Sequence, residues 1–206
     1  FRSVRHTCSW DAHEPLRSHR SGWPGMMAEP NFREGIGVLF RMSHAFDALV
    51  YHPQLSELAD LAGAFPDAVF ILNHIGRPLG VGPYAGHRYE IFEVWKKDMT
   101  ALAERPNVVV KVGGLGNRVS GFGWDPRPTP PDSTELTEAT SPYYLHTIET
   151  FGPERCMFES NFPVDKVSYS YNVMYNAFKR ITKDHSASER ADMFHDVAAK
   201  VYRVDV

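Results

Sequence analysis

The sequence predicts an α/β fold built on a parallel sheet, because short strand-like runs alternate with helical patterns along the chain. The clearest strand is residues 68–72, where five apolar residues follow one another as in a strand covered on both faces. Repeated strand–helix–strand order favours parallel strands joined by right-handed crossovers. On the order of elements alone, an open doubly wound sheet and a barrel both satisfy this pattern.

The first half of the chain supplies two further strands and two helices. Residues 2–6 open the chain as a strand, and a polar loop with several prolines follows. Residues 31–44 carry apolar side chains at helical spacing, and residues 45–52 form the next strand. Pro53 occupies a first helical position and opens a helix that ends near residues 65–67. This helix leads into the buried strand at 68–72.

The second half repeats the alternation. A helix around Trp95 stops at Pro106 and is followed by a strand at 107–112. Residues 113–140 are rich in Gly, Pro, Ser and Thr, which predicts a long loop. We expect Ser141 and Pro142 to cap the next helix, and residues 155–160 to form the fifth strand. Two helices finish the chain, the last one opened by a capping box from Ser186 to Glu189.

Composition narrows the class of protein. The chain has 206 residues, 43% of them hydrophobic, which fits one domain over residues 1–206. A formal net charge of -3 argues against a general nucleic-acid or anionic-membrane surface. No run approaches 18 apolar residues, so no membrane span is expected. The 2 cysteines, Cys8 and Cys156, are too few for a disulfide framework and favour a reducing, cytoplasmic setting.

Three successive strands finish in histidine, at His6, His52 and His74. The carboxyl ends of parallel strands share one face, where active sites are commonly built from the following loops. We therefore expect the three imidazoles to converge there, with Lys111 and the Ser160-Asn161 pair on the next two strands. A histidine that closes a strand can also cap carbonyl groups or pack beside a loop, so a structural role for each stays open.

Two other patterns favour a structural interpretation. Residues 113–116, Gly-Gly-Leu-Gly, follow a strand, but they lack the third glycine and the helix start of a dinucleotide-binding turn. Asp165 comes shortly after Pro163 and is expected to cap a helix.

Trp124 lies in the long loop, from which its ring can line a pocket.

Three segments together carry a resemblance to a known family. They are residues 65–78, which include Asn-His-Ile-Gly-Arg-Pro; residues 106–111, which include Pro-Asn-Val and Lys111; and residues 151–163, which include Glu-Ser-Asn-Phe-Pro. In this order they resemble the amidohydrolase-related enzymes, predicted metal-dependent hydrolases of TIM-barrel fold that include lactonases. The similarity extends from Phe1 to Arg203.

The resemblance implies an α/β fold of the TIM (β/α) barrel type that is incomplete and lacks its first strands. Family members carry a His-x-His pair at the end of the first barrel strand, and this chain has none. A complete barrel typically takes about 250 residues. A second departure is Asn161, which stands where the family usually has an aspartate. An asparagine can orient water but cannot act as a base.

The resemblance further implies hydrolysis of a small carboxylic ester or lactone by an activated water. In this hypothesis His74 and Asn161 are catalytic, and His74 also binds a divalent metal, zinc or manganese. The loop at 113–140 closes over the site. The substrate is a small carboxylate, and the residues expected around it are Arg5, His6, His52, Arg77, Lys111 and Trp124.

Other interpretations remain open at this stage. A decarboxylase of the same superfamily would use a similar site on a carboxylate substrate. A catalytically inactive fragment or a binding protein would explain Asn161 and the missing His-x-His pair. We also expect the 206-residue chain alone to be inactive. It is expected to bind neither nucleic acid nor membrane, and a homo-oligomer is compatible with the sequence.

Overall fold

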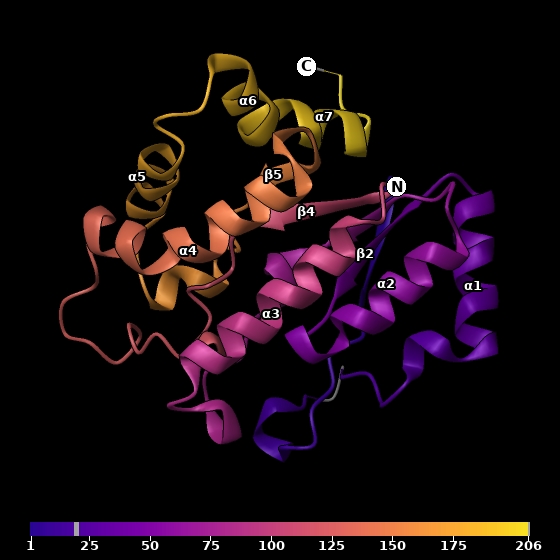
Figure 1. Cartoon of the computed structure of the whole chain (residues 1–206), viewed down its shortest axis with the longest axis horizontal. Helices are drawn as coiled ribbons and strands as arrows, with labels where there is room; N and C mark the ends of the chain where they lie inside the picture. The colour runs from indigo at the N-terminus through magenta and orange to yellow at the C-terminus, as the bar shows by residue number, and fades with distance from the viewer. Residues whose placement is uncertain (19–20, 206) are drawn as a thin grey trace.

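Five parallel strands form one sheet with the spatial order β1-β2-β3-β4-β5 in a computed structural model that describes residues 1–18 and 21–205 (Figure 1). In a doubly wound sheet the order in which strands are added reverses partway through the sheet. Here each new strand is added on the same side of the one before it, as in a barrel. Within the described residues the sheet does not close, so the fold is an incomplete TIM-type barrel. The strands are β1 (Ser3–Thr7), β2 (Ala45–Leu49), β3 (Phe70–Leu72), β4 (Val108–Val112) and β5 (Cys156–Phe158).

Helices connect the strands and extend the chain beyond β5 (Figure 1). The predicted alternation of elements is therefore confirmed, and boundaries differ mostly by a few residues. Short 310 turns, among them η3 (His52–Gln54), η4 (Asn73–Gly76) and η8 (Val164–Val167), follow several strands. The helices are α1 (Pro30–Arg41), α2 (Leu55–Ala64), α3 (Arg88–Ala103), α4 (Ser133–Phe151), α5 (Tyr171–Ile181), α6 (Ala187–Ala191) and α7 (Val197–Tyr202), with a π-helical turn at Asp192–Asp196.

The two faces of the sheet differ in what covers them. Alternate residues such as Phe46, Phe70 and Val110 join the main core with helices α1 to α4. The opposite, inward face carries Ile71 and Met157, which pack with Val197 of α7 in a smaller core. Polar residues follow these apolar ones toward the carboxyl ends of the strands. The barrel interior is thus apolar near the amino ends of the strands and polar at the carboxyl ends.

One helix boundary was predicted wrongly. We expected the loop to run to residue 140 and a helix to begin at Ser141-Pro142, but α4 begins at Ser133 and contains Pro142. The Asp132 carboxylate caps this helix by accepting hydrogen bonds from the backbone N–H groups of Thr134 and Glu135 at 2.8 and 2.9 Å. The described loop is therefore shorter than predicted.

No helix within the described ranges has both the length and the apolar character needed to cross a bilayer.

Candidate functional site

Polar side chains from all five strand ends meet on the inward face at the carboxyl edge of the sheet. Arg5 of β1 is in register with Asp47 of β2, so both side chains leave the same face. Lys111 of β4 donates hydrogen bonds to Asp47 and, at 3.2 Å, to Asn73 after β3. Glu159 follows β5 directly. This edge is the candidate active site.

His74 follows β3 and Glu159 follows β5, and the two side chains form a buried pair at the end of β4, the strand between them. The Glu159 carboxylate contacts the His74 ring at Nδ1, and it also accepts a hydrogen bond from the His74 backbone N–H at 3.0 Å. The side chains are 2% and 14% exposed. A carboxylate at Nδ1 holds the proton on that nitrogen and leaves the Nε2 lone pair free to accept another.

The electrostatics support this assignment of protons. Burial lowers the pKa of His74, although the Glu159 charge opposes the shift. Burial alone would raise the pKa of Glu159, but nearby His74, Lys111 and Arg5 outweigh it and hold the pKa below its usual value. At neutral pH the pair is therefore a neutral imidazole and an ionised carboxylate. This is the form in which a histidine can act as a general base.

Two glycines at the end of β4 allow this pair to come together. A Cβ on Gly113 would lie 2.4 Å from the Glu159 carbonyl oxygen, and a Cβ on Gly114 would lie 2.6 Å from the Cβ of His74. Gly114 also has a φ of +79°, which side-chain-bearing residues rarely adopt. The glycine-rich run is thus explained by close packing around the site.

Asn161 is held by a second carboxylate, that of Asp165. The amide Nδ2 of Asn161 donates a hydrogen bond to Asp165 Oδ1 at 2.6 Å. The other carboxylate oxygen accepts from Gly116 N–H at 3.1 Å and from Tyr169 O–H at 3.0 Å. Because the amide nitrogen is engaged, the Asn161 oxygen is directed away from Asp165 as a hydrogen-bond acceptor. Asp165 lies inside η8, and its side chain binds to the loop after β4 instead of capping a helix.

We expect Asp165 to make the folded chain less stable as the pH rises from about 4 to about 6. Burial raises the pKa of this carboxyl from its ordinary value of 3.8 to about 6. In that range the folded state keeps a proton that the unfolded state has lost, so the free energy of unfolding falls by up to about 3 kcal/mol. Urea unfolding of the wild type and Asp165→Asn at pH 4 and 6.5 measures this. The stability difference between the two proteins must change with pH, and a constant difference would contradict the assignment.

Lys111 is engaged within the protein. It forms an ion pair with Asp47, and its ammonium lies 5.3 Å from the centroid of the Tyr202 ring. Asp47 also accepts hydrogen bonds from Ser3 Oγ at 2.5 Å and from Tyr202 O–H at 3.2 Å. The structure therefore places Lys111 at the site, as predicted, but as the partner of a buried carboxylate.

Arg5 and Arg77 are the other predicted cations, and both reach the site. Arg5 lies 3.9 Å from Asp47, with a side chain that is 48% exposed. The charge of Arg77 acts on His74, and the charges of Glu159 and Asp165 act on Arg77. The Arg77 Nε is buried, and within residues 1–18 and 21–205 it has no hydrogen-bond partner.

Two of the predicted imidazoles do not converge with His74. His6 is exposed and faces α1, with its ring centroid 6.1 Å from that of Phe32, because side chains alternate along β1 and Arg5 takes the inward face. His52 is buried in η3, where Nδ1 accepts a hydrogen bond from Leu79 N–H at 3.3 Å. Burial lowers the pKa of His52 to about 4, so the ring stays neutral and braces the loops.

Trp124 packs behind the site. It is 5% exposed and stacks on Phe122, with ring centroids 4.4 Å apart. Its other neighbour is Tyr169, the residue that donates to Asp165, at 5.8 Å. Trp124 therefore supports the Asp165 group from the loop, and it does not line any of the cavities described for this chain.

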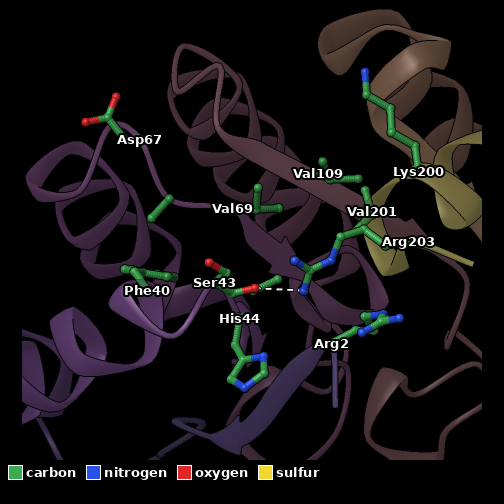
Figure 2. Close-up of a pocket in the computed structure, with 12 residues that line it drawn as sticks. Arg2, Phe40, Ser43, His44, Asp67, Val69, Val109, Lys200, Val201 and Arg203 are labelled. Atoms are coloured by element: carbon green, nitrogen blue, oxygen red, sulfur yellow. Dashed lines mark hydrogen bonds between the residues drawn. The ribbon is translucent and has the colours of Figure 1, made fainter.

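A cavity of about 450 Å³ lies at the opposite edge of the sheet (Figure 2). It is lined by residues from the amino ends of the strands and from α7, among them Arg2, His44, Val109 and Arg203. Figure 2 shows the Arg203 guanidinium reaching the carbonyl oxygen of Ser43, at 2.7 Å. None of the catalytic candidates lines this cavity, so its size does not identify the functional site.

Comparison with known proteins settles the family. The amidohydrolase family model matches residues 1–204. The chain belongs to the amidohydrolase family. An uncharacterized protein of Sinorhizobium fredii, y4mH, is 41% identical over 181 residues, which cover 88% of this chain and 54% of that protein. An L-fucono-1,5-lactonase of Burkholderia multivorans is 25% identical over 175 residues, with 84% and 56% covered.

A solved amidohydrolase of Burkholderia multivorans with bound zinc shares the fold. Its TM-score is 0.80 at 23% sequence identity, over 99% of this chain and 65% of that one. The chain thus spans a little over half the length of the curated relatives it matches, 54% and 56%. The barrel-type architecture is confirmed.

The described side chains of the candidate site do not by themselves form a set of ligands that could hold a metal ion. In the part of the chain that the structure describes, no group of three or more His, Cys, Asp or Glu side chains is arranged to hold one. The His74 Nδ1 is occupied by Glu159. The Lys111 ammonium donates to both Asp47 and Asn73, so it already supplies the positive charge that these oxygen atoms would otherwise draw from a metal ion. We therefore derive no step through zinc or manganese.

Three residues of this site were not predicted as functional: Asp47, Glu159 and Asp165. Glu159 and Asp165 flank Asn161 in the sequence, two residues before it and four after it. Each has a partner far away in the chain, since Glu159 contacts His74 and Asp165 contacts Gly116, although Asp165 also binds Asn161 and Tyr169 nearby. The glycine-rich run after β4 was the available signal, because glycine after a strand indicates a close approach.

Proposed function

We propose that the protein containing this chain hydrolyses a small carboxylic ester or lactone with an activated water. The buried His74–Glu159 pair at the carboxyl edge of the sheet carries this proposal. A neutral imidazole held by a carboxylate is a general base matched to neutral pH. The family assignment and the similarity to an L-fucono-1,5-lactonase support the reaction class.

In this proposal His74 takes a proton from water at Nε2, and the oxygen of the water attacks the carbonyl carbon. Glu159 stabilises the imidazolium that forms. The oxygen of the Asn161 amide accepts the second water hydrogen and orients the attack, since Asp165 binds the amide nitrogen. As the carbon–oxygen bond of the ester or lactone breaks, His74 returns the proton to the leaving alkoxide. The products are an alcohol and a carboxylic acid, which loses its proton to solvent at neutral pH.

In our proposal the loop after β4 shields the site from bulk water, while the one attacking water is bound at His74 and Asn161. Its residues Gly113 and Gly114 pack against the His74–Glu159 pair, and its Trp124 packs behind Tyr169. Exclusion of water strengthens the charge interactions that stabilise the imidazolium.

His74→Gln is expected to reduce lactone hydrolysis by about 10²- to 10⁴-fold, because it removes the general base. The assay uses the natural protein that contains this chain. It follows the release of acid from a panel of γ- and δ-lactones. His195→Gln is the matched control, since His195 also contacts a carboxylate, Asp196 at 2.6 Å, but on the exposed surface.

Undiminished turnover by His74→Gln would remove His74 from the mechanism. Release of carbon dioxide without ring opening would assign the site to a decarboxylase instead. If no lactone or ester in the panel is opened by the wild type, the proposed reaction class is wrong.

A further inference from the structure

The loop after β4, residues 113–132, is in backbone contact with the loop after β3. Gly80 N–H donates a hydrogen bond to the Val119 carbonyl oxygen at 2.8 Å. A Cβ on Gly80 would lie 2.4 Å from the Ser120 carbonyl oxygen, and a Cβ on Gly121 would lie 2.2 Å from the Gly80 carbonyl oxygen. The two backbones approach so closely that a side chain does not fit at either glycine. The loop after β4 is therefore anchored at residues 119–121.

Arg88 is the first residue of α3, and its side chain holds the same part of the loop. Its Nη2 donates hydrogen bonds to the carbonyl oxygens of Gly121 at 2.8 Å and of Ser120 at 3.4 Å. Its guanidinium also lies over the Phe122 ring, 4.0 Å from the ring centroid. A hydrogen bond from a charged donor and a cation on an aromatic face are each stabilising. Arg88 thus binds both the backbone and a side chain of the loop.

The Phe122 ring lies between Arg88 and Trp124. The Phe122 and Trp124 rings stack, with centroids 4.4 Å and planes 7° apart. A guanidinium and an indole that are both this close to one ring cannot share a face of it, so they lie on opposite faces. Trp124 in turn meets the Tyr169 ring at an angle of 66°, with centroids 5.8 Å apart. A continuous stack of side chains therefore runs from Arg88 to Tyr169.

This stack ends at the carboxylate that holds Asn161. Tyr169 O–H donates to Asp165 Oδ2 at 3.0 Å, and Gly116 N–H donates to the same oxygen at 3.1 Å. The other oxygen of Asp165 accepts from Asn161 Nδ2 at 2.6 Å. Two donors to Asp165 thus depend on the loop after β4, because Gly116 belongs to it and Tyr169 packs against its Trp124. Movement of this loop would change the direction of the Asn161 amide.

We propose that Arg88 is a positioning residue, which holds the loop after β4 against the site and so keeps Asp165 aimed at Asn161. It acts through the loop, since its contacts are with residues 120–122. For its effect on the reaction this inference rests on the proposed function, whereas its effect on the loop is independent of turnover. It extends the candidate site to a helix that carries none of the catalytic candidates.

Hydrogen exchange resolved to single backbone amides tests this hold on the loop without turnover. In the natural protein that contains this chain, Arg88→Gln is expected to exchange the Gly80 and Gly116 amides at least about tenfold faster than the wild type. The Gly80 amide reports the contact between the two loops, and the Gly116 amide reports the hydrogen bond to Asp165. Unchanged exchange at either amide would overturn the proposal.

Arg155→Gln is the matched control. Arg155 also donates to backbone carbonyl oxygens, those of Ala103 at 3.1 Å and Arg105 at 3.0 Å, and its guanidinium lies 5.1 Å from the centroid of the Phe151 ring. These contacts lie before β5, at the amino edge of the sheet. We expect Arg155→Gln to leave the two reporting amides as they are in the wild type. Equal acceleration by Arg155→Gln would overturn the proposal, because it would show a general loss of stability.

Steady-state kinetics on the best lactone of the panel test the positioning role. Arg88→Gln is expected to lower kcat about tenfold and to leave KM within about twofold, because it misplaces the amide that orients the attacking water. In an Asn161→Ala background the same change should lower kcat by less than about twofold, since the group that Arg88 positions is gone. Equal losses in the two backgrounds would overturn the proposal.

The two sets of measurements separate this inference from the proposed function. Faster exchange at both amides in Arg88→Gln, with no lactone opened by the wild type, would sustain the hold on the loop and Asp165 and overturn the proposed function. Unchanged exchange, with lactones opened normally by Arg88→Gln, would overturn the inference and leave the hydrolase standing.

Discussion

Replacing Glu159 with glutamine is expected to lower kcat by about 10²- to 10⁴-fold while the fold is kept. The amide has the shape of the carboxylate and can still accept a hydrogen bond from His74. It carries no charge, so it cannot stabilise the imidazolium that forms when His74 takes a proton from water. Steady-state kinetics on the best lactone of the panel measures the loss, and thermal unfolding checks the fold.

The pH profile distinguishes this role from a structural one. The Glu159 charge raises the pKa of His74, so its removal lowers that pKa. Because the neutral imidazole is the active form, the acidic limb of kcat/KM should move to lower pH in Glu159→Gln. Asp196→Asn is the control, since Asp196 contacts His195 on the surface. A normal kcat, or an acidic limb that does not move, would contradict the role given to Glu159.

The sequence was sufficient for the order of strands and helices along the chain, because each element depends on a local pattern. The apolar run at 68–72 contains β3, and the valines before and after Lys111 form β4. Strand order needed the resemblance, because a repeating strand–helix pattern satisfies both a barrel and a doubly wound sheet. The structure decides by adding every strand on one side.

Convergence of strand-end side chains was predicted in part. His74 and Lys111 reach the site, but His6 does not, because adjacent residues on a strand face opposite sides. Arg5 and His6 therefore cannot both point inward from β1. The same alternation would have selected Asp47, which is in register with Arg5.

The carboxylates of the site depend in part on long-range contacts that no local pattern contains. Asn161 carries no charge, unlike the aspartate that the resemblance leads one to expect at this position. One carboxylate lies on each side of it in the sequence, Glu159 before it and Asp165 after it. Glu159 pairs with a ring from β3, and Asp165 turns back to the loop after β4. Only the fold shows that one polarises His74 while the other orients Asn161.

Lys111→Met is expected to destabilise the folded chain by about 3–5 kcal/mol, because it leaves the Asp47 carboxylate buried without its ammonium partner. Asp47 is 2% exposed, and its remaining donors are hydroxyl groups and the more distant Arg5. Equilibrium urea unfolding measures the change. Lys96→Met is the control, because Lys96 pairs with Glu93 at 3.4 Å on the surface, where such pairs contribute at most about 1 kcal/mol.

A double-mutant cycle with Asp47→Asn separates the ion pair from the packing of the lysine stem. If the loss comes from an uncompensated charge, Lys111→Met combined with Asp47→Asn should recover most of the stability, since the amide carries no charge. Loss that persists in the double variant would assign the effect to packing against Tyr202, whose ring lies 5.3 Å from the ammonium. Recovery would also mean that the Lys111 ammonium is committed to Asp47.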